Sequence, residues 1–326
     1  MWFRPYSTRP VGVRKARRRP LSKGAQAFLD QADPEAAPIR DLPVETARDA
    51  VDTLMSEIDQ PGPEVASVEA CVGPGVEGQA ADLHVYTPFG KPRGVLVFLH
   101  GGGWTLGNAR AYDGFARRLC RATRHIVASV DYPLSPENKY PAAIHAGLSA
   151  LAWARDAADR AGLGERSVAL AGDSAGGTLA AAIALRTADR SDVSLSHLAL
   201  FYPVLVIPEM AEHASRELLG DGRYFLSRED VSWAAGNYLA DPGLANTQDV
   251  SPLLAEDLTG LPPVTVITAG YDPLRDEGAD FVRRARRAGV PAKLYCFDRT
   301  VHGFMGFSHV MGEAAIAFEV LRRRFR

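Results

Sequence analysis

Short apolar runs alternate with longer amphipathic stretches along most of the chain. Residues 94–99 (GVLVFL) form a continuous apolar run, which is typical of a strand buried on both faces of a parallel sheet. Similar runs predict strands at residues 126–130, 167–171, 197–201, 264–269 and 293–297, and an antiparallel edge at 65–72 and 82–87. Helical periodicity predicts helices at residues 112–121, 142–161, 175–186, 276–288 and 313–324. This alternation predicts an α/β fold with a mostly parallel central sheet and helices on both faces.

Two segments interrupt this pattern. Residues 24–65 combine short helical runs with proline breakers, and we expect them to form cap helices at the periphery. Between residues 205 and 262 no strand-like run occurs, but residues 227–240 are helix-like and include Trp233 and Tyr238. An insertion of this kind usually folds over the strand ends as a lid. The expected organisation is a basic flexible extension at 1–23, cap helices at 24–65 and an α/β domain at 66–326 with a small helical cap inserted at about 205–262.

The composition is that of an ordinary globular protein. Hydrophobic residues make up 46% and charged residues 23%, which excludes general disorder, collagen and coiled coils. The three cysteines, Cys71, Cys120 and Cys296, form no C-x-x-C pair. We therefore expect no disulfide scaffold and no thiolate zinc site, and a reducing compartment fits best.

Positive charge is concentrated at the N-terminus. Of the 37 Lys and Arg, eight lie in residues 1–23, which hold no acid, and the rest of the chain carries 29 bases against 39 acids. We expect no nucleic-acid partner for so acidic a body, although the basic segment could touch anionic surfaces. No apolar h-region follows the arginines, and no window approaches 18 uninterrupted apolar residues. The sequence therefore predicts no secretory signal, no membrane span and a cytoplasmic location.

A serine stands at a predicted strand-to-helix turn. Residues 172–176 (GDSAG) match G-x-S-x-G, with an apolar strand before them and a helix of small residues after them. In this setting the serine has strained backbone angles, and its hydroxyl stands above a helix N-terminus that favours developing negative charge. The flanking elements favour a nucleophilic Ser174 over a plain structural turn.

Three consecutive glycines follow the buried strand at 94–99. The three glycines in residues 100–104 (HGGGW) lower the stability of the fold, because glycine loses more conformational freedom on folding than any other residue. A structural need that would offset this cost is a backbone whose N–H groups point at an oxyanion. A flexible loop and a phosphate-binding loop are the alternatives, and the second lacks the lysine and spacing of a P-loop.

A serine nucleophile needs a base, and the base needs an orienting acid. Among eight histidines, His302 follows the last predicted strand, and Asp272 follows the strand at 264–269. Asp276, Glu277 and Asp280 would lie on the next helix, where acids in the first turn commonly interact only with the helix dipole. Nucleophile, acid and histidine all follow strand C-termini, where open α/β sheets build their sites, and their chain order is that of α/β-hydrolases.

These motifs together resemble those of the bacterial hormone-sensitive-lipase-like carboxylesterases (family IV esterases) of the α/β-hydrolase superfamily, and especially their acetyl-esterase members. The resemblance covers about residues 80 to 320. The matching motifs are HGGG-aromatic at 100–104, GDSAGG at 172–177, DPL-acid at 272–277 and HGF at 302–304. Residues 131–137 (DYPLSPE) are similar to a further motif, DYRLAPE, from which they depart at Pro133 and Ser135.

The resemblance implies an α/β-hydrolase fold and a role for each matching residue. Ser174 would be the nucleophile, His302 the base and Asp272 its orienting acid. The N–H groups of Gly102, Gly103 and Ala175 would form the oxyanion hole, His100 would hold the glycine loop, and Asp173 would support the elbow. Four aromatic side chains would line the acyl or alcohol pocket: Trp104, Tyr202, Trp233 and Phe304. For each of them, a purely structural role in the core is at least as well supported. No metal or organic cofactor is implied.

The function implied is that of a serine carboxylesterase for short-chain acyl esters, with a small-molecule ester as its partner. A ligand-binding protein on the same fold, as in the gibberellin receptors, is an alternative, but the chain keeps all three triad residues. Hydrolysis of an amide, carbamate or lactone is a second alternative. A homodimer through residues 293–297 or the terminal helix is also possible.

Overall fold

In a computed structural model of the protein, residues 19–33, 35–58, 62–164, 167–188, 194–208 and 212–325 are described. They form an eight-stranded sheet in the order β1-β2-β4-β3-β5-β6-β7-β8. The strands are β1 (Ser67–Val72), β2 (Asp82–Thr87), β3 (Val95–Leu99), β4 (Ile126–Asp131), β5 (Val168–Asp173), β6 (Leu195–Phe201), β7 (Val264–Tyr271) and β8 (Ala292–Val301). Strand β2 is antiparallel to both β1 and β4, and the remaining pairs are parallel. The predicted α/β architecture with an antiparallel edge is confirmed.

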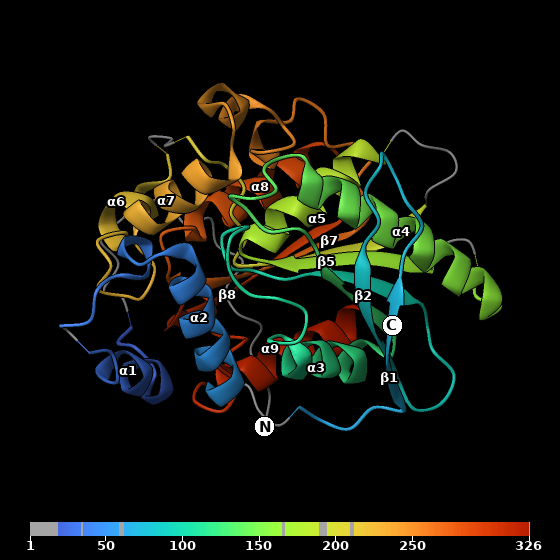
Figure 1. Cartoon of the computed structure of the whole chain (residues 1–326), viewed down its shortest axis with the longest axis horizontal. Helices are drawn as coiled ribbons and strands as arrows, with labels where there is room; N and C mark the ends of the chain where they lie inside the picture. Colours follow the sequence, from blue (N-terminus) through green and yellow to red (C-terminus); the bar gives the residue numbers. More distant parts are fainter. Residues whose placement is uncertain are drawn as a thin grey trace.

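Helices cover both faces of this sheet (Figure 1). One face carries α4 (Ala142–Arg160), α5 (Ala175–Arg186) and α8 (Arg275–Arg287), and the other carries α3 (Asp113–Thr123) and α9 (Glu313–Arg324). Strand side chains alternate between the faces. Val95 and Val97 of β3 therefore pack in the core under α4 and α5, whereas Leu96 and Phe98 pack against α3. Every residue of β3 is buried, which explains why its sequence is continuously apolar.

The strand order places two loops side by side. From β3 the chain moves to β4 on one side and then returns to β5 on the other side of β3. Open α/β sheets bind ligands at such a reversal, beyond the C-terminal ends of the strands, which here are β3 and β5. The ladder between these strands ends at Leu99 and Gly172, so the glycine loop and the serine turn leave the sheet as neighbours.

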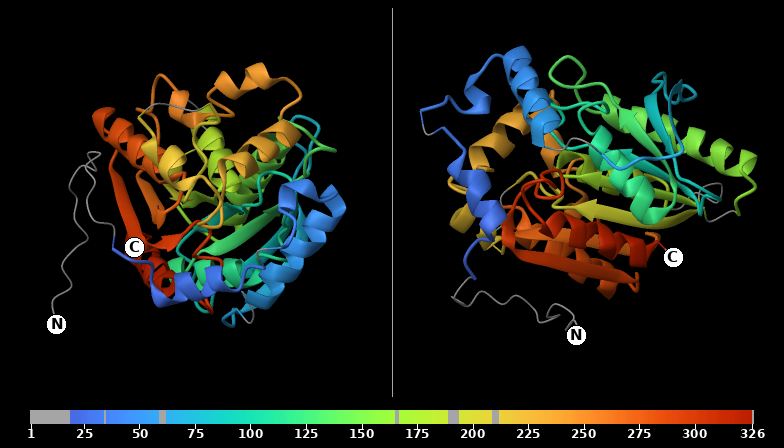
Figure 2. Two further views of the ribbon diagram at one scale, coloured as in Figure 1. Left: turned by 90° about the vertical axis from the view of Figure 1, so that its left-hand side faces the viewer. Right: turned by 90° about the horizontal axis from the view of Figure 1, so that it is seen from below.

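The segments predicted as caps contain helices on one side of the molecule (Figures 1 and 2). They are α1 (Lys23–Asp30), η1 (Ile39–Asp41), α2 (Val44–Ile58), α6 (Ala214–Leu219), α7 (Arg228–Tyr238), η2 (Pro242–Asn246) and η3 (Pro252–Leu254). Arg40 of η1 forms an ion pair with Asp230 of α7 at 2.9 Å, which joins the two segments. Arg48 of α2 binds Glu137 at 2.7 Å and donates to the Thr105 carbonyl at 3.0 Å, close to the glycine loop.

Some boundaries differ from the sequence prediction. Strand β7 continues two residues and β8 four residues beyond the predicted ends. The flexible extension predicted for residues 1–23 lies mostly outside the described residues, but its last part is attached to the body. Tyr271 donates to the Arg19 carbonyl at 2.7 Å, and the Ser22 N–H donates to the Arg299 carbonyl at 2.9 Å. Among the described residues, no helix has the length and apolar character needed to cross a membrane.

Candidate active site

Ser174 occupies the turn between β5 and α5. Its φ of 51° and ψ of −119° are strained for a residue with a side chain. Two glycines make the turn possible. A Cβ on Gly176 would lie 2.0 Å from the Leu99 carbonyl oxygen, and one on Gly172 would lie 2.1 Å from the Gly176 carbonyl oxygen. The small residues therefore bring helix α5 close against the sheet, and the serine hydroxyl stands at the strand ends.

The three residues predicted as a triad are joined by hydrogen bonds. The Ser174 Oγ lies 2.9 Å from His302 Nε2, and His302 Nδ1 lies 2.9 Å from Asp272 Oδ2. Asp272 is fully buried and directly follows β7, and its Oδ1 accepts the Leu274 N–H at 2.8 Å. His302 directly follows β8 and is 6% exposed. An Nδ1–H that donates to the carboxylate leaves the Nε2 lone pair free to accept the serine proton.

The glycine loop leaves β3 beside this triad. Gly102 and Gly103 have φ values of 111° and 60°, and a Cβ on Gly102 would lie 2.0 Å from the Leu106 carbonyl oxygen. Within the described part of the chain, the N–H groups of Gly102, Gly103 and Ala175 have no hydrogen-bond acceptor. Ala175 begins the twelve-residue helix α5, whose N-terminus carries partial positive charge. The three N–H groups can therefore bind a developing oxyanion.

His100 and Tyr132 fix the start of the glycine loop. His100 is fully buried, and its Nδ1 lies 2.7 Å from the Gly101 carbonyl oxygen. The Tyr132 hydroxyl donates to the His100 carbonyl oxygen at 2.8 Å, and the two rings stack with centroids 4.3 Å apart. Burial lowers the pKa of His100, so the neutral imidazole is favoured. Tyr132 belongs to the motif at residues 131–137, but no role was predicted for it, because its contact with His100 joins residues that are distant in the sequence.

Asp173 contacts the same loop from the serine turn. Its Oδ1 accepts the Gly101 N–H at 2.7 Å, and its Oδ2 accepts the Tyr112 hydroxyl at 3.3 Å. Burial raises the pKa of the Asp173 carboxyl to about 7. The role of Tyr112 could not be read from the sequence either.

The four predicted pocket aromatics lie in different surroundings. The Tyr202 ring packs edge-on against the His302 ring, with centroids 5.0 Å apart. Phe304 is fully buried and packs against Tyr202. Trp104 is also buried and stacks on Tyr238 of α7 at 4.6 Å, which couples the glycine loop to the cap. Trp233 is half-buried on α7 and packs against the main core.

Glu277 corrects one sequence interpretation. As an acid in the first turn of α8 it was expected to interact only with the helix dipole. Instead its fully buried carboxylate accepts the Leu205 and Val206 N–H groups at 2.6 and 2.9 Å, and it pairs with Arg216 at 2.9 Å. Arg216 also donates to the Val206 carbonyl oxygen. Glu277 and Arg216 together hold residues 205–206, where the chain enters the cap, against the start of α8.

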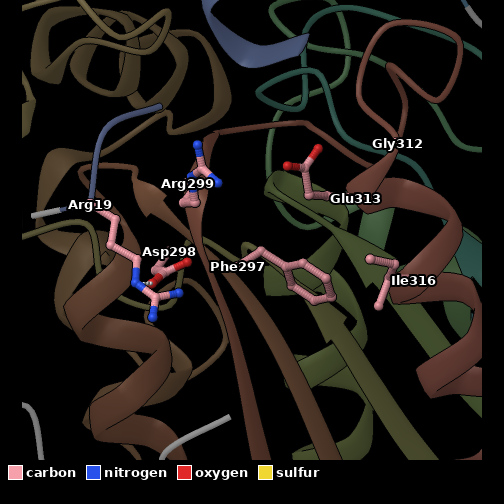
Figure 3. A pocket seen from close by; sticks show the side chains of 7 residues that line it. All are labelled: Arg19, Phe297, Asp298, Arg299, Gly312, Glu313 and Ile316. Atoms are coloured by element: carbon pink, nitrogen blue, oxygen red, sulfur yellow. Dashed lines mark ion pairs between the residues drawn. The ribbon is translucent and has the colours of Figure 1, made fainter. Parts of the chain in front are cut away.

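A hollow of about 340 Å³ lies elsewhere on the surface, between β8 and the start of α9 (Figure 3). An ion pair between Arg19 and Asp298, with 3.9 Å between Nε and Oδ2, lies at one side of it. Its lining residues are Arg19, Phe297, Asp298, Arg299, Gly312, Glu313 and Ile316. It contains none of the triad or glycine-loop residues. The described residues also contain no cluster of three or more His, Cys, Asp or Glu side chains that could hold a metal ion.

Sheet topology, serine turn and glycine loop together define an α/β-hydrolase. Comparison with known proteins agrees. The family description "alpha/beta hydrolase fold" matches residues 96–306, and the chain belongs to this family. It is 36% identical over 262 residues to the carboxylic ester hydrolase LipN of Mycobacterium tuberculosis, which spans 78% of this chain and 69% of that protein. It is 34% identical to an arylesterase of Saccharolobus solfataricus, over 71% of this chain and 75% of that protein.

Solved structures give the same result. An esterase of Pyrobaculum calidifontis superimposes with a TM-score of 0.85 at 32% identity, over 94% of this chain and 98% of the other. The ester-hydrolase EH1AB1 from the metagenome of Lake Arreo gives a TM-score of 0.87 at 32% identity, with the same coverage. The predicted kinship with the hormone-sensitive-lipase-like esterases is confirmed.

Proposed function

We propose that this chain is a serine carboxylesterase, with Ser174 as nucleophile, His302 as general base and Asp272 as the acid that orients the histidine. The observation that carries the proposal is the continuous hydrogen-bonded series from Ser174 through His302 to Asp272, with 2.9 Å at each step. It lies at the strand ends where an α/β sheet exposes a site. The relatives described above are named as a carboxylic ester hydrolase and an arylesterase, and these names support the same reaction.

The reaction proceeds in two halves. Ser174 Oγ attacks the ester carbonyl carbon while its proton passes to His302 Nε2, and the carbonyl oxygen becomes an oxyanion. The oxyanion accepts hydrogen bonds from the Gly102, Gly103 and Ala175 N–H groups. Collapse of the tetrahedral intermediate expels the alcohol, which takes the proton from His302. Water then gives a proton to the same His302 and attacks the acyl carbonyl carbon, which forms a second tetrahedral oxyanion. Its collapse releases the carboxylic acid, and Ser174 Oγ takes the proton back from His302.

A short acyl chain is the proposed substrate preference. Cap helix α7 packs against the glycine loop, where a Cβ on Gly103 would lie 2.8 Å from the Ala234 Cβ. The Trp104–Tyr238 stack fills the adjacent space. Helix α7 therefore limits the room beside the oxyanion site, which favours short over long acyl groups.

The test is hydrolysis of p-nitrophenyl esters from acetate to palmitate. In Ser174→Ala we expect kcat to fall by roughly 10⁴-fold or more, because the triad acts as a unit. Ser196→Ala is the matched control, since Ser196 only donates to the Val168 carbonyl at the opposite end of the sheet. Equal turnover in wild type and Ser174→Ala would overturn the assignment. A wild type inactive on every ester would favour the ligand-binding alternative, or an amide, carbamate or lactone substrate.

We also propose a homodimer and a cytoplasmic location. Strand β8 ends the sheet order, so one of its edges pairs with no strand among the described residues. An edge strand of ten residues is a ready surface for pairing with a second copy.

The free cysteines Cys71, Cys120 and Cys296 suit a reducing compartment, which supports the proposed cytoplasmic location. Light scattering that gives the mass of a monomer at every concentration would overturn the dimer, and cell fractionation tests the location.

A further inference from the structure

One carboxyl group joins the two loops that contribute the oxyanion-binding N–H groups. Asp173 Oδ1 accepts the Gly101 N–H at 2.7 Å, a distance typical of a strong, charge-assisted hydrogen bond. The contact is also close in the steric sense, because a Cβ on Gly101 would lie 2.6 Å from Asp173 Oδ2. The Asp173 side chain is buried, so this bond does not compete with water.

The position of this bond gives it a mechanical role. The backbone ladder between β3 and β5 ends at Leu99 and Gly172. Beyond this point the ladder pairs no further residues of the two strands, and the Asp173–Gly101 bond is the next connection between them. On one side it is attached next to Ser174, and on the other side next to Gly102. It therefore acts at the place where the spacing of the N–H groups is set.

We propose that Asp173 is a positioning residue for the ester hydrolysis proposed above. Its carboxyl holds the Gly102 and Gly103 N–H groups at a fixed separation from the Ala175 N–H, so that all three converge on one oxygen. Such convergence matters because oxyanion donors are effective only about 2.7–3.1 Å from the charged oxygen. The inference rests on the proposed function, since it assigns a role within that reaction.

The surroundings of Asp173 hold the carboxyl in a single orientation. The Tyr112 hydroxyl, at the start of α3, donates to Oδ2 at 3.3 Å. His302, at the end of β8, also acts on the carboxyl electrostatically and lowers the pKa of Asp173 against the effect of burial. Either protonation state of Asp173 leaves an oxygen that accepts the Gly101 N–H, and the charged state binds it more strongly.

The test compares Asp173→Ala with Asp173→Asn. The alanine removes the acceptor of the Gly101 N–H. We expect kcat for p-nitrophenyl acetate to fall roughly 10- to 100-fold, which is no more than the fall in kcat when a whole oxyanion donor is removed. KM should change less than about twofold, because the ground-state ester gains little from the oxyanion site. Asparagine keeps an oxygen at the same place, and we expect it to restore kcat to within about fivefold of wild type.

A second readout separates positioning from folding. Affinity for a trifluoromethyl ketone, which forms a tetrahedral oxyanion on Ser174, should fall in the same ratio as kcat. Affinity for the alcohol product should stay unchanged. Tyr112→Phe should give a smaller loss of the same kind. Tyr86→Phe is the matched control, because Tyr86 donates to Asp113 at 3.0 Å, away from the glycine loop.

The outcomes are distinct. If Asp173→Ala does not fold, Gly101→Ala disturbs the same contact from the opposite side and should lower kcat with KM unchanged. A folded Asp173→Ala or Gly101→Ala with wild-type kcat and ketone affinity would overturn the inference while the proposed function stands. A wild type that hydrolyses no ester and binds no ketone would overturn both.

Discussion

The buried pair of Glu277 and Arg216 allows a quantitative test of how the cap is attached. We consider Glu277→Gln, which keeps the shape of the side chain and removes its charge. The Glu277 side chain is fully buried, and the Arg216 side chain is 8% exposed. Loss of the carboxylate therefore leaves the guanidinium buried without a counter-charge.

The size of the effect follows from these contacts. Breaking a buried ion pair by removing one partner costs about 3–5 kcal/mol. Arg216 keeps its hydrogen bonds to the Val206 and Ile207 carbonyl oxygens, which reduces the penalty. Burial also raises the pKa of Glu277 despite the attraction of Arg216, so desolvation already offsets part of the pair's strength. We therefore expect a loss near the lower end of the range, about 3 kcal/mol in the free energy of unfolding.

Urea unfolding at neutral pH measures this loss. The midpoint should fall while the m-value stays constant, since the area exposed on unfolding is unchanged. Asp221→Asn serves as the control, because the Asp221–Arg223 pair is largely exposed and should contribute less than about 1 kcal/mol. A loss below about 1 kcal/mol in Glu277→Gln would refute the reasoning that this charge pair is needed at the cap entrance.

Two further predictions concern pH and backbone conformation. Burial lowers the pKa of His197 to about 3, so the stability that its neutral form supplies is present above its unfolded pKa and is lost as pH falls toward 3. His197→Gln, which can keep the bond to Thr265 Oγ1, should flatten the fall in the urea midpoint between pH 7 and pH 4, and equal slopes would contradict this. Gly103→Ala should lower kcat at least about tenfold, because its φ is 60° and the new Cβ would press on Ala234 beside the oxyanion donors. Gly162→Ala, with φ 63° and no atom within 4 Å, should cost stability alone, so a similar fall in kcat there would argue against the steric explanation.

Much of the sheet could be predicted because its central strands are buried on both faces. Strand β3 has no polar position, and a run of that kind is hard to place elsewhere than in a parallel sheet. Ser174, Asp272 and His302 each follow a strand, and parallel strands bring their C-terminal ends to one edge. The structure accordingly places His302 within hydrogen-bond distance of both Ser174 and Asp272.

Residues whose partners are distant in sequence were not predictable in the same way. The end of β8 contains Asp298, Arg299 and Thr300, and polar residues at a sheet edge carry no apolar signal. Glu277 has the sequence context of any acid in a first helical turn. Its function depends on Leu205 and Val206 passing over the start of α8, which no periodicity reveals.

The small residues of α5 have a consequence for protein engineering. A Cβ on Gly177 would lie 2.7 Å from the Pro203 Cβ, and Gly176 is still more confined. In a library made by random mutagenesis over the whole chain, we therefore expect most variants with a substitution at Gly176 or Gly177 to fail to fold. Leu218 lies in the cap and is 51% exposed, so it can accept other side chains without disturbing the sheet. A library of variants should therefore leave the helix behind the serine untouched and vary exposed positions of the cap.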